Sequence, residues 1–420
     1  MSETPTQFLD AVRALRATFP ETPSKYVLPL TRNTLGDAEI AAALEVMVRG
    51  NVTLGPNVLA FERAFAERHG AADAVFCNSG SSANLLACAA LNEDPRPLAP
   101  GDEIVVPAVT WSTSVWPIAQ VGAVPVLADV SPETLNVTVE SVERALSPKT
   151  RAVLLVHLLG NPAPVAQIKK LCDERNLVLI EDTCESMDAL VGGKRTGTFG
   201  RFGTFSFYFS HHISTMEGGM VVCENADDGD TLRALRGHGW TRQMRVATRR
   251  AYEAKHTDVD PRFLFVRAGY NLRPTEVAGA IGLVQLARAA EFVAHRKRTA
   301  ALWSEARAAL PKLFSPMRID DGSSHFALPL VLAPGAPARS ALFAFFDAHG
   351  VETRPMVAGN LARQPAMARV KHRIAGPLTG ADILHERGGY IGIHPLPLSD
   401  HELALLPQLM RDFAKKHDLA

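Results

Sequence analysis

RAVLLVHLLGNPAPVAQIKKLCDERNLVLIED, residues 151–182, contains two kinds of apolar pattern. AVLLVH (152–157) and LVLIED (177–182) are short and apolar at nearly every position, as expected of strands that are buried on both faces of a parallel sheet. PVAQIKKLCDERN (164–176), which lies between them, has its apolar residues at helical spacing. This order of strand, helix and strand predicts a crossover unit of a parallel α/β sheet.

The same alternation of strands and helices occurs in the part of the chain that precedes this unit. Further strands are expected at AVFCN (74–78), EIVVP (103–107) and VPVLADV (124–130), with helices at SANLLACAALN (82–92) and SVWPIAQVG (114–122). Helical spacing also occurs in FLDAVRALRATF (8–19) and VLAFERAFAERHG (58–70). From about residue 73 to 225, the sequence therefore predicts a mostly parallel sheet that is covered on both faces.

The C-terminal part of the chain has a different organisation. A helical pattern spans residues 275–310 and is long enough to lead out of the large domain. After it, HFALPLVL, ALFAFFDAHG and YIGIHP fit a smaller α+β layer. We therefore expect an N-terminal arm or helix at 1–35, a large cofactor-binding domain at 36–285 and a small C-terminal domain at 286–420.

The composition is that of an ordinary soluble globular protein. Of the 420 residues, 47% are hydrophobic and 21% are charged, and 44 Lys and Arg balance 44 Asp and Glu. This balance and the lack of a basic run argue against a nucleic-acid partner. The stretch MSETPTQFLD does not have the pattern of a secretion signal, and we expect that no apolar run approaches the length of a membrane span.

The five cysteines are odd in number, scattered and never spaced as Cys-x-x-Cys. This usage argues against a disulfide framework and against a thiolate metal site. A reducing, cytoplasmic location is therefore expected.

Ligands of an open parallel sheet bind outside the carboxyl ends of the strands, so the residues that follow each strand are the candidates for a site. Four places stand out: Ser79 to Ala83, Trp111, Asp182 with Glu185, and His211 with His212. The small residues at 79–83 begin an expected helix, whose free amides favour a phosphate.

Each of these features also has an ordinary structural explanation. The serines suit a helix N-cap, Trp111 suits core packing, and Asp182 suits a cap or an ion pair. A buried histidine is more often hydrogen-bonded than catalytic, and neighbouring histidines on a strand point to different sides, which argues against a shared metal. Taken together, however, a phosphate site, an aromatic plate, a carboxylate and an imidazole suit pyridoxal phosphate, whose protonated ring accepts electrons.

Several longer segments carry a resemblance over almost the whole chain: NVTLGPNVLAFERAFAERHG, NSGSSANLLA, GDEIVVPAVTWSTSVWPI, VHLLGNP, IEDTCESMDA, GTFGRFGTFSFYFSHHISTMEGGMV and AGYNLRPTEVAGAIGL. In these segments the chain resembles the DegT/DnrJ/EryC1/StrS sugar aminotransferases, which are pyridoxal-phosphate enzymes that act on nucleotide-linked keto sugars. The resemblance implies an α/β architecture of aspartate aminotransferase fold type I. Its large domain holds a mostly parallel sheet of the seven-stranded type between helices, and a smaller α+β domain follows.

The resemblance also assigns contacts to the cofactor phosphate. Gly80 and Ser81 would hold it through the start of their helix, and Ser206 would add a hydroxyl. Asn271, in GYNLRPTE, matches the residue that reaches the phosphate of the neighbouring subunit. A homodimer with shared active sites is therefore implied.

Contacts to the cofactor ring follow in the same way. The resemblance implies that Trp111 stacks on the pyridine ring and that Asp182 pairs with the ring nitrogen. Glu185 stands where the family has a side chain near the ring hydroxyl.

One position departs from the aminotransferase pattern. The family motif S-F-x-x-x-K ends in a lysine, whereas Ser206 and Phe207 are followed at that position by His211. A lysine both tethers the cofactor covalently and moves protons, and a histidine can do only the second. Histidine here resembles the 3-dehydratases of the family, which remove the C3 hydroxyl of nucleotide-linked 4-keto-6-deoxysugars on the way to 3,6-dideoxysugars. There the cofactor acts in its amine form, pyridoxamine phosphate.

Some of these 3-dehydratases hold an iron-sulfur cluster through cysteines in the C-terminal half, but this chain has no cysteine after Cys223. The resemblance is therefore to the cluster-free subgroup, in which L-glutamate restores the amine form of the cofactor. Substrate or glutamate binding is assigned to five residues, His238, Trp240, Arg242, Arg354 and Arg363. The three arginines are equally consistent with surface ion pairs.

Two other functions remain open at this stage. An aminotransferase could use another lysine, for which Lys194 in GGKRTG is the nearest candidate. A regulator that binds the cofactor without turnover would keep the phosphate site and need no base. The sequence does not determine which nucleotide or which hexose the substrate carries.

Overall fold

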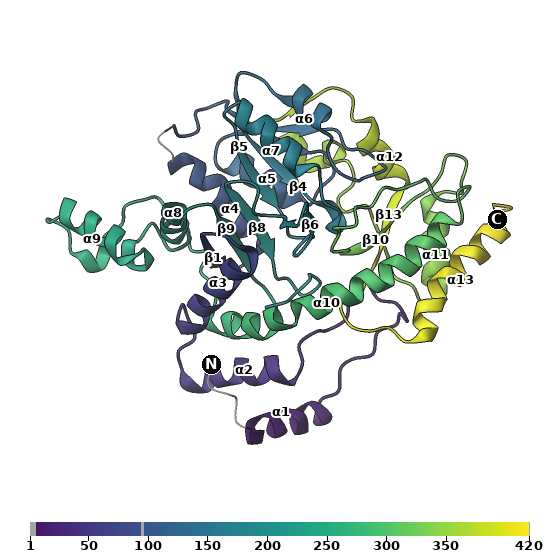
Figure 1. Cartoon of the computed structure of the whole chain (residues 1–420), viewed down its shortest axis with the longest axis horizontal. Helices are drawn as coiled ribbons and strands as arrows, with labels where there is room; N and C mark the ends of the chain where they lie inside the picture. The colour runs from purple at the N-terminus through teal and green to yellow at the C-terminus, as the bar shows by residue number, and fades with distance from the viewer. Residues whose placement is uncertain (1–5, 94–95, 420) are drawn as a thin grey trace.

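The computed structural model describes residues 6–93 and 96–419 and has an α/β body with a smaller α+β part at one end (Figure 1). The helices are α1 (Thr6–Thr18), α2 (Asp37–Arg49), α3 (Pro56–His69), α4 (Gly80–Ala90), α5 (Ser112–Gln120), α6 (Val139–Ala145), α7 (Val165–Glu174), α8 (Ala226–Arg236), α9 (Val246–Lys255), α10 (Glu276–Ala308), α11 (Arg339–Ala348), α12 (Thr379–Arg387) and α13 (Asp400–Lys416). The strands are β1 (Asp73–Cys77), β2 (Glu103–Pro107), β3 (Val124–Ala128), β4 (Thr150–Val156), β5 (Val178–Asp182), β6 (Leu190–Val191), β7 (Lys194–Arg195), β8 (Phe202–Ser206), β9 (Gly219–Cys223), β10 (Ala327–Val331), β11 (Thr353–Pro355), β12 (Arg373–Ile374) and β13 (Gly388–Gly392).

The central sheet confirms the parallel α/β prediction. Its strand order is β1-β9-β8-β5-β4-β2-β3-β12, and every pairing in it is parallel except the two that β9 makes with β1 and β8. All residues of β2 and β3 are buried, which explains why these strands are apolar except at Glu103, which pairs with Arg373 at 2.7 Å. Seven strands come from the body, and the short β12 is added by the C-terminal part of the chain.

The expected long helix is present as α10, which packs on α2 and α3 at one end and on α13 at the other. A three-stranded antiparallel sheet, β10-β13-β11, forms the smaller part together with α11 and α13. The core of this smaller part includes Trp303, Phe346 and Phe413. Leu28, from the N-terminal segment between α1 and α2, joins this core. The domain limits at residues 35 and 285 stay a prediction. Helix α10 continues through residue 285 without a break.

The C-terminal part also returns to the body. After β11, the chain places Leu361, Met367 and Leu384 in the core of the large sheet, and β12 pairs in parallel with β3. The segment therefore connects the smaller sheet to the strand ends of the large one.

α10 is also the one helix, among residues 6–93 and 96–419, that is long and apolar enough to cross a membrane by length and composition alone. The expectation that no apolar run reaches this limit was therefore wrong. The apolar stretch is 56% buried inside the protein, as in the core helix of a soluble protein. Packing against α2, α3 and α13 explains its apolar composition.

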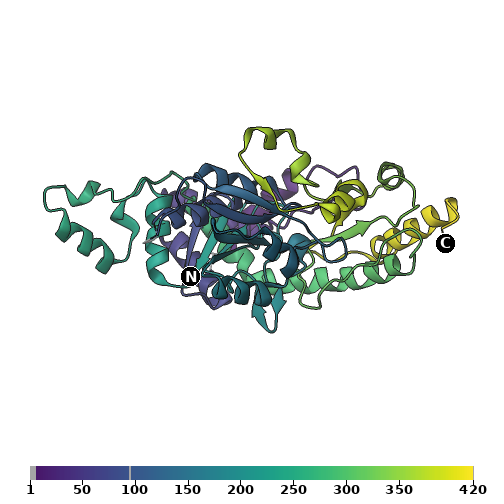
Figure 2. The same cartoon turned by 90° about the horizontal axis from the view of Figure 1, so that it is seen from above.

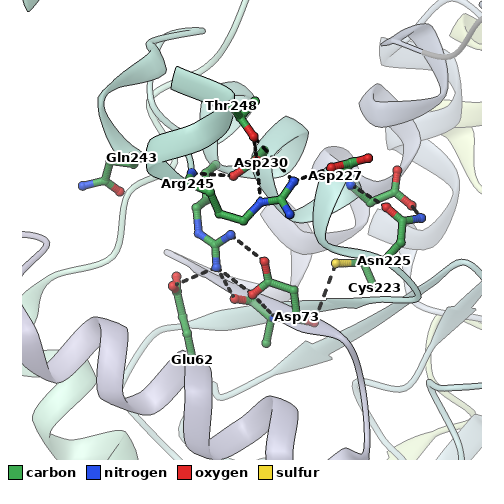
Figure 3. Close-up of polar contacts among 12 residues, drawn as sticks. Glu62, Asp73, Cys223, Asn225, Asp227, Asp230, Gln243, Arg245 and Thr248 are labelled. Carbon is green, nitrogen blue, oxygen red and sulfur yellow. Dashed lines mark hydrogen bonds and ion pairs between the residues drawn. The ribbon is translucent and has the colours of Figure 1, made fainter. Parts of the chain in front are cut away.

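An arm, defined here as residues 237–270, projects from the body and carries α9 at its far end (Figures 1 and 2). Charged contacts anchor the base of this arm, as Figure 3 shows. Arg245 donates to Asp230 at 2.8 Å and also pairs with Asp227, and Arg233 of α8 pairs with Asp73 of β1 at 2.6 Å. The base of the arm is therefore fixed to α8 and through it to the edge of the sheet.

Glu276, at the start of α10, caps a second helix. Its carboxylate is buried and accepts hydrogen bonds from the backbone N–H groups of Gly55 (2.7 Å), Asn57 and Val58 (3.1 Å). Because α3 has a glycine at its N-cap, it has no capping side chain of its own. Glu276 therefore supplies the acceptor that the first turn of α3 needs.

We expect Glu276→Ala to lower the free energy of unfolding by about 2–4 kcal/mol, because three backbone donors lose their buried acceptor. Equilibrium unfolding in urea measures this change. Glu305→Ala, at an exposed position of the same helix, is the control and should change stability by no more than about 0.5 kcal/mol. Equal effects of the two substitutions would contradict the capping role.

Candidate functional site

The start of α4 lies against the end of β8. Ser79 is the N-cap, and its hydroxyl accepts from the N–H of Ser82 at 3.1 Å. A Cβ atom on Gly80 would lie 2.5 Å from the Cβ of Ser206 and 3.0 Å from the Sγ of Cys184, so only glycine fits there. The N–H groups of Gly80 and Ser81 have no acceptor among the described residues. These unpaired donors at a helix start can bind an oxyanion.

Asp182, at the end of β5, is held in one orientation. It is 5% exposed, and its Oδ2 accepts from Asn84 Nδ2 at 2.8 Å and from the hydroxyl of Ser114 at 2.7 Å. Its Oδ1 accepts from the N–H of Cys184 at 3.1 Å. The hydroxyl of Thr204 donates to Asn84 Oδ1 at 2.6 Å, which fixes the amide so that its NH₂ faces the carboxylate. The negative charge is therefore positioned by neutral donors.

Trp111 lies at the start of α5, beside this carboxylate. Its backbone C=O accepts from the N–H of Ser114, and Thr113 joins α5 to α4 through a hydroxyl contact of 2.9 Å with Ser81. The Trp111 side chain is 60% exposed, so core packing does not explain it. A flat, exposed ring three residues before Ser114, which holds the carboxylate, is suited to stacking on a planar ligand.

His211 lies in the loop after β8. Its Nδ1 is 2.7 Å from the backbone oxygen of Cys184, and because a carbonyl only accepts, Nδ1 carries the proton. The lone pair is therefore on Nε2, which has no hydrogen-bond partner within the described part of the chain. Burial lowers the pKa of His211 to about 4, so the imidazole is neutral at pH 7 and available as a base.

His212 points elsewhere. Its Nε2 donates to the backbone oxygen of Ser324 at 3.2 Å, and burial lowers its pKa well below the usual value. The two imidazoles therefore contact different backbone oxygens, those of Cys184 and Ser324. No group of three metal-ligating side chains is found in residues 6–93 and 96–419.

Glu185 follows Asp182 and faces the loop after β4. Its Oε2 accepts from the N–H of Leu159 at 2.7 Å. Burial raises the pKa of Glu185 to about 7, and the neighbouring negative charge of Asp182 adds to this increase. The group can therefore exist as a neutral carboxyl that donates a hydrogen bond near neutral pH.

Asn271 does not contact the residues above. It lies on a ribbon in which residues 237 and 271 pair, and its side chain is exposed. Its Oδ1 accepts from the Nε of Arg273 at 2.9 Å, which leaves the amide NH₂ directed away from that arginine. A residue so placed can serve a site outside its own subunit.

Three of the five substrate-binding candidates lie on the arm. His238 is exposed and has a φ of 66°, with its N–H bonded to the backbone oxygen of Tyr270. Trp240 stacks parallel to Phe263, with ring centroids 6.1 Å apart. The guanidinium of Arg242 lies 5.1 Å from the Trp240 ring centroid. These side chains form an aromatic and cationic surface.

The other two candidates belong to the C-terminal part and are held in ion pairs. Arg354, on β11, pairs with Glu352 at 2.9 Å. Arg363 pairs with Asp382 at 2.8 Å and with Glu386 at 3.1 Å. This arrangement is the alternative that the sequence left open for them, and their role in binding stays a prediction.

Sequence reasoning missed several residues that support the site. Asn84 and Ser114 hold Asp182, and Asn84 is four residues after Gly80, on the same side of α4. That helical spacing was a signal that could have identified it. Leu159 contributes only its backbone N–H to Glu185, and no sequence pattern marks such a contact.

The residues present fit pyridoxal phosphate. The unpaired N–H groups at Gly80 and Ser81 suit the phosphate, and the absence of room for a Cβ at Gly80 keeps this approach open. Asp182 suits a protonated ring nitrogen, because its charge is fixed by neutral donors. The exposed Trp111 ring suits the planar pyridine.

Comparison with known proteins supports this fit. The sequence profile of the DegT/DnrJ/EryC1/StrS aminotransferase family matches residues 33–403. GDP-4-keto-6-deoxy-D-mannose 3-dehydratase of Yersinia pseudotuberculosis is 36% identical over 375 residues, which is 89% of this chain and 95% of that protein.

Solved structures give the same relationship. GDP-4-keto-6-deoxy-D-mannose-3-dehydratase of E. coli with bound hydrated PLP superposes with a TM-score of 0.84 at 34% identity and covers 91% of this chain and 99% of that chain. A structure of GDP-4-keto-6-deoxymannose-3-dehydratase with a trapped PLP-glutamate geminal diamine has a TM-score of 0.82 at 33% identity, with the same coverage of both chains. The fold is therefore that of the pyridoxal-phosphate aminotransferases, as the sequence implied.

We expect Gly80→Ala to weaken binding of pyridoxal phosphate at least tenfold, because the added methyl group forces the start of α4 away from Ser206. Titration of the protein with pyridoxal phosphate, followed by absorbance, measures the dissociation constant. Ser206→Gly provides the control, since the double variant Gly80→Ala/Ser206→Gly removes the closest clash and should bind as Ser206→Gly does. Failure of the second substitution to restore binding would contradict the steric explanation.

Proposed function

The chain belongs to the DegT/DnrJ/EryC1/StrS aminotransferase family, and we propose that it is a pyridoxal-phosphate-dependent 3-dehydratase. It removes the C3 hydroxyl of a nucleotide-linked 4-keto-6-deoxyhexose, in the biosynthesis of 3,6-dideoxysugars. L-Glutamate returns the cofactor to its amine form, pyridoxamine phosphate. One observation carries the proposal: an imidazole with a free Nε2 stands where the aminotransferase motif has a lysine.

The bound cofactor supplies an amine that joins the C4 keto carbon of the sugar and a ring that accepts an electron pair. Gly80 and Ser81 hold its phosphate through their N–H groups, with Ser206 beside them. Asp182 would keep the ring nitrogen protonated, and Trp111 would stack on the ring. Glu185 would serve the ring hydroxyl. No iron-sulfur cluster takes part.

His211 moves the proton. With the cofactor bound, its Nε2 would accept and hold a proton, since the lone pair on that atom is free. The imidazolium that results is unfavourable in its buried position, where the pKa is about 4. The proton therefore passes on to the departing C3 hydroxyl, which leaves as water. A single group acts first as base and then as acid.

The substrate binds where the arm and the body meet. A cleft of about 180 Å³ there is lined by Trp240, Arg242, Arg233 and Arg273, and no acidic side chain lines it. Cationic and aromatic groups suit the phosphates and base of a nucleotide. His238 stands at the same end of the arm. Arg354 and Arg363, on the C-terminal part, serve the substrate or the carboxylates of glutamate.

The protein acts as a homodimer with shared sites. Asn271, exposed and without contact to its own site, reaches the cofactor phosphate of the neighbouring subunit. Large apolar side chains are exposed near the site and on the adjoining α2 and α3, with Met47 58%, Val48 81%, Leu59 51% and Tyr208 48% exposed. A second copy would remove such a surface from water. We place the enzyme in the cytoplasm.

An aminotransferase is the nearest alternative, and the position of Lys194 does not favour it. This lysine is on β7, where its Nζ lies 4.7 Å from the ring centroid of Phe199. It lines a separate cleft with Arg68 and His69, and it has no contact with His211 or Asp182 among the described residues. A lysine at that place cannot take over the role of a tether.

Borohydride separates a tethered from an untethered cofactor. We expect reduction of the protein loaded with pyridoxal phosphate to leave no covalent label on the chain, because histidine forms no stable imine with an aldehyde. Intact-protein mass spectrometry measures the label, and a lysine-tethered aminotransferase of the family serves as the positive control. A stoichiometric mass increase that maps to Lys194 or to any other lysine would refute the proposal.

His211→Asn tests the base. We expect the rate of dehydration to fall by about 10²–10⁴, since general base catalysis is lost, while the affinity for pyridoxal phosphate changes less than about threefold. His212→Asn is the matched control, because that imidazole faces Ser324 instead of the site. Products from a panel of nucleotide-linked 4-keto-6-deoxyhexoses with glutamate are identified by mass spectrometry. An amino sugar as the product would indicate an aminotransferase, and cofactor binding without any turnover would indicate a regulator.

A further inference from the structure

Arg296, in the middle of α10, is a buried cation without a carboxylate. It is 1% exposed, and no acidic side chain in the described part of the chain lies within ion-pair distance of it. Its Nη1 donates to the backbone oxygens of Phe326 (2.9 Å) and Ile393, and its Nη2 lies 3.4 Å from the backbone oxygen of His211. The Nε has no partner.

Such a group is costly to keep. Burying an unpaired ion costs several kcal/mol even after the protein relaxes around it. Burial lowers the pKa of Arg296 to about 9, which still leaves it charged at neutral pH. The charge is held by the backbone oxygens that accept hydrogen bonds from the guanidinium.

Its acceptors come from three separate segments. The oxygen of His211 belongs to the loop after β8, the oxygen of Phe326 precedes β10, and the oxygen of Ile393 follows β13. The Phe326 ring is near both groups: its centroid lies 5.9 Å from the guanidinium carbon of Arg296 and 5.2 Å from the centroid of the His211 imidazole. Arg296 therefore joins the loop of the catalytic base to the smaller sheet.

The charge also acts on the imidazoles around it. Four buried or half-buried histidines lie near enough for Arg296 to disfavour their protonation: His211, His212, His325 and His394.

His211 has other charged and titratable neighbours as well. Asp182 at the end of β5 opposes Arg296, because its negative charge favours the imidazolium. Tyr208, His212 and Cys184 are further titratable residues beside it. Arg296 is a permanently charged cation beside the loop after β8, with its Nη2 3.4 Å from the backbone oxygen of His211.

We propose that Arg296 is a positioning residue for the reaction: it fixes the loop of His211 against the smaller sheet and places a permanent positive charge behind the imidazole, so that Nε2 stays a free base. This role rests on the proposed function, in which His211 is the base. The geometry that supports it is independent of the substrate.

Arg296→Met and Arg296→Lys separate the two parts of the role. Removing the cation raises the pKa of His211, so the acidic limb of the pH profile of kcat/KM should move to higher pH by about one unit in Arg296→Met. Lysine keeps the charge but loses the planar fork that joins the three segments. Arg296→Lys should therefore keep the acidic limb near its original pH, while kcat falls about tenfold or more because the base is misplaced.

Arg307→Met is the matched control. Arg307 is on the same helix, is 5% exposed, and donates to the backbone oxygen of Pro329 at 2.8 Å, away from the site. Its loss should destabilise the protein in a similar way and leave the acidic limb unchanged. An equal shift in Arg307→Met would show a general effect of destabilisation and would overturn the proposal.

A second readout needs no substrate. In protein with ¹³C-labelled histidine, the resonance that disappears in His211→Asn belongs to His211, and its titration midpoint should rise in Arg296→Met. An unchanged midpoint would overturn the proposal even where dehydration is confirmed. A raised midpoint in a protein that dehydrates no sugar would keep the electrostatic role and contradict the proposed function instead. Should Arg296→Met not fold, the titration and rate of Arg296→Lys still decide the positioning part.

Discussion

The hydrogen bond from His211 Nδ1 to the backbone oxygen of Cys184 decides what the site can do. A carbonyl oxygen cannot donate, so this contact fixes both the tautomer and the orientation of the imidazole. The lone pair is then confined to Nε2. Because Cys184 follows Asp182 by two residues, the bond also sets the distance between the proposed base and the carboxylate that would stabilise the cofactor ring. Reversal of this tautomer would leave a donor where the reaction needs an acceptor.

The residues around His211 hold the carboxyl groups of Asp182 and Glu185 in different ways. Asp182 is held by Asn84 and Ser114, which are neutral, so its negative charge remains available to a cationic ring. Glu185, by contrast, has its pKa raised to about 7 by burial and is suited to a neutral hydrogen bond. Two carboxyl groups three residues apart therefore lie in different surroundings: neutral donors hold Asp182, and burial raises the pKa of Glu185.

The smaller sheet takes part in this arrangement without supplying the base. The segment after β11 returns to the strand ends of the large sheet, and the loop at residues 323–326 passes beside both imidazoles. α10 carries Arg296 between the two parts and brings three distant backbone segments to one guanidinium. The chemistry of the loop after β8 therefore depends on the packing of the C-terminal half of the chain.

The sequence by itself determined the parallel sheet, the long helix and the residues at the strand ends, because periodicity and strand-end position are local properties. It also determined that a histidine replaces the lysine of the aminotransferase motif. Only the tertiary structure decided the tautomer of that histidine, the donors that hold Asp182 and the buried cation 85 residues away. These features depend on backbone oxygens and on contacts between distant segments, and neither leaves a periodic signal in the order of the side chains.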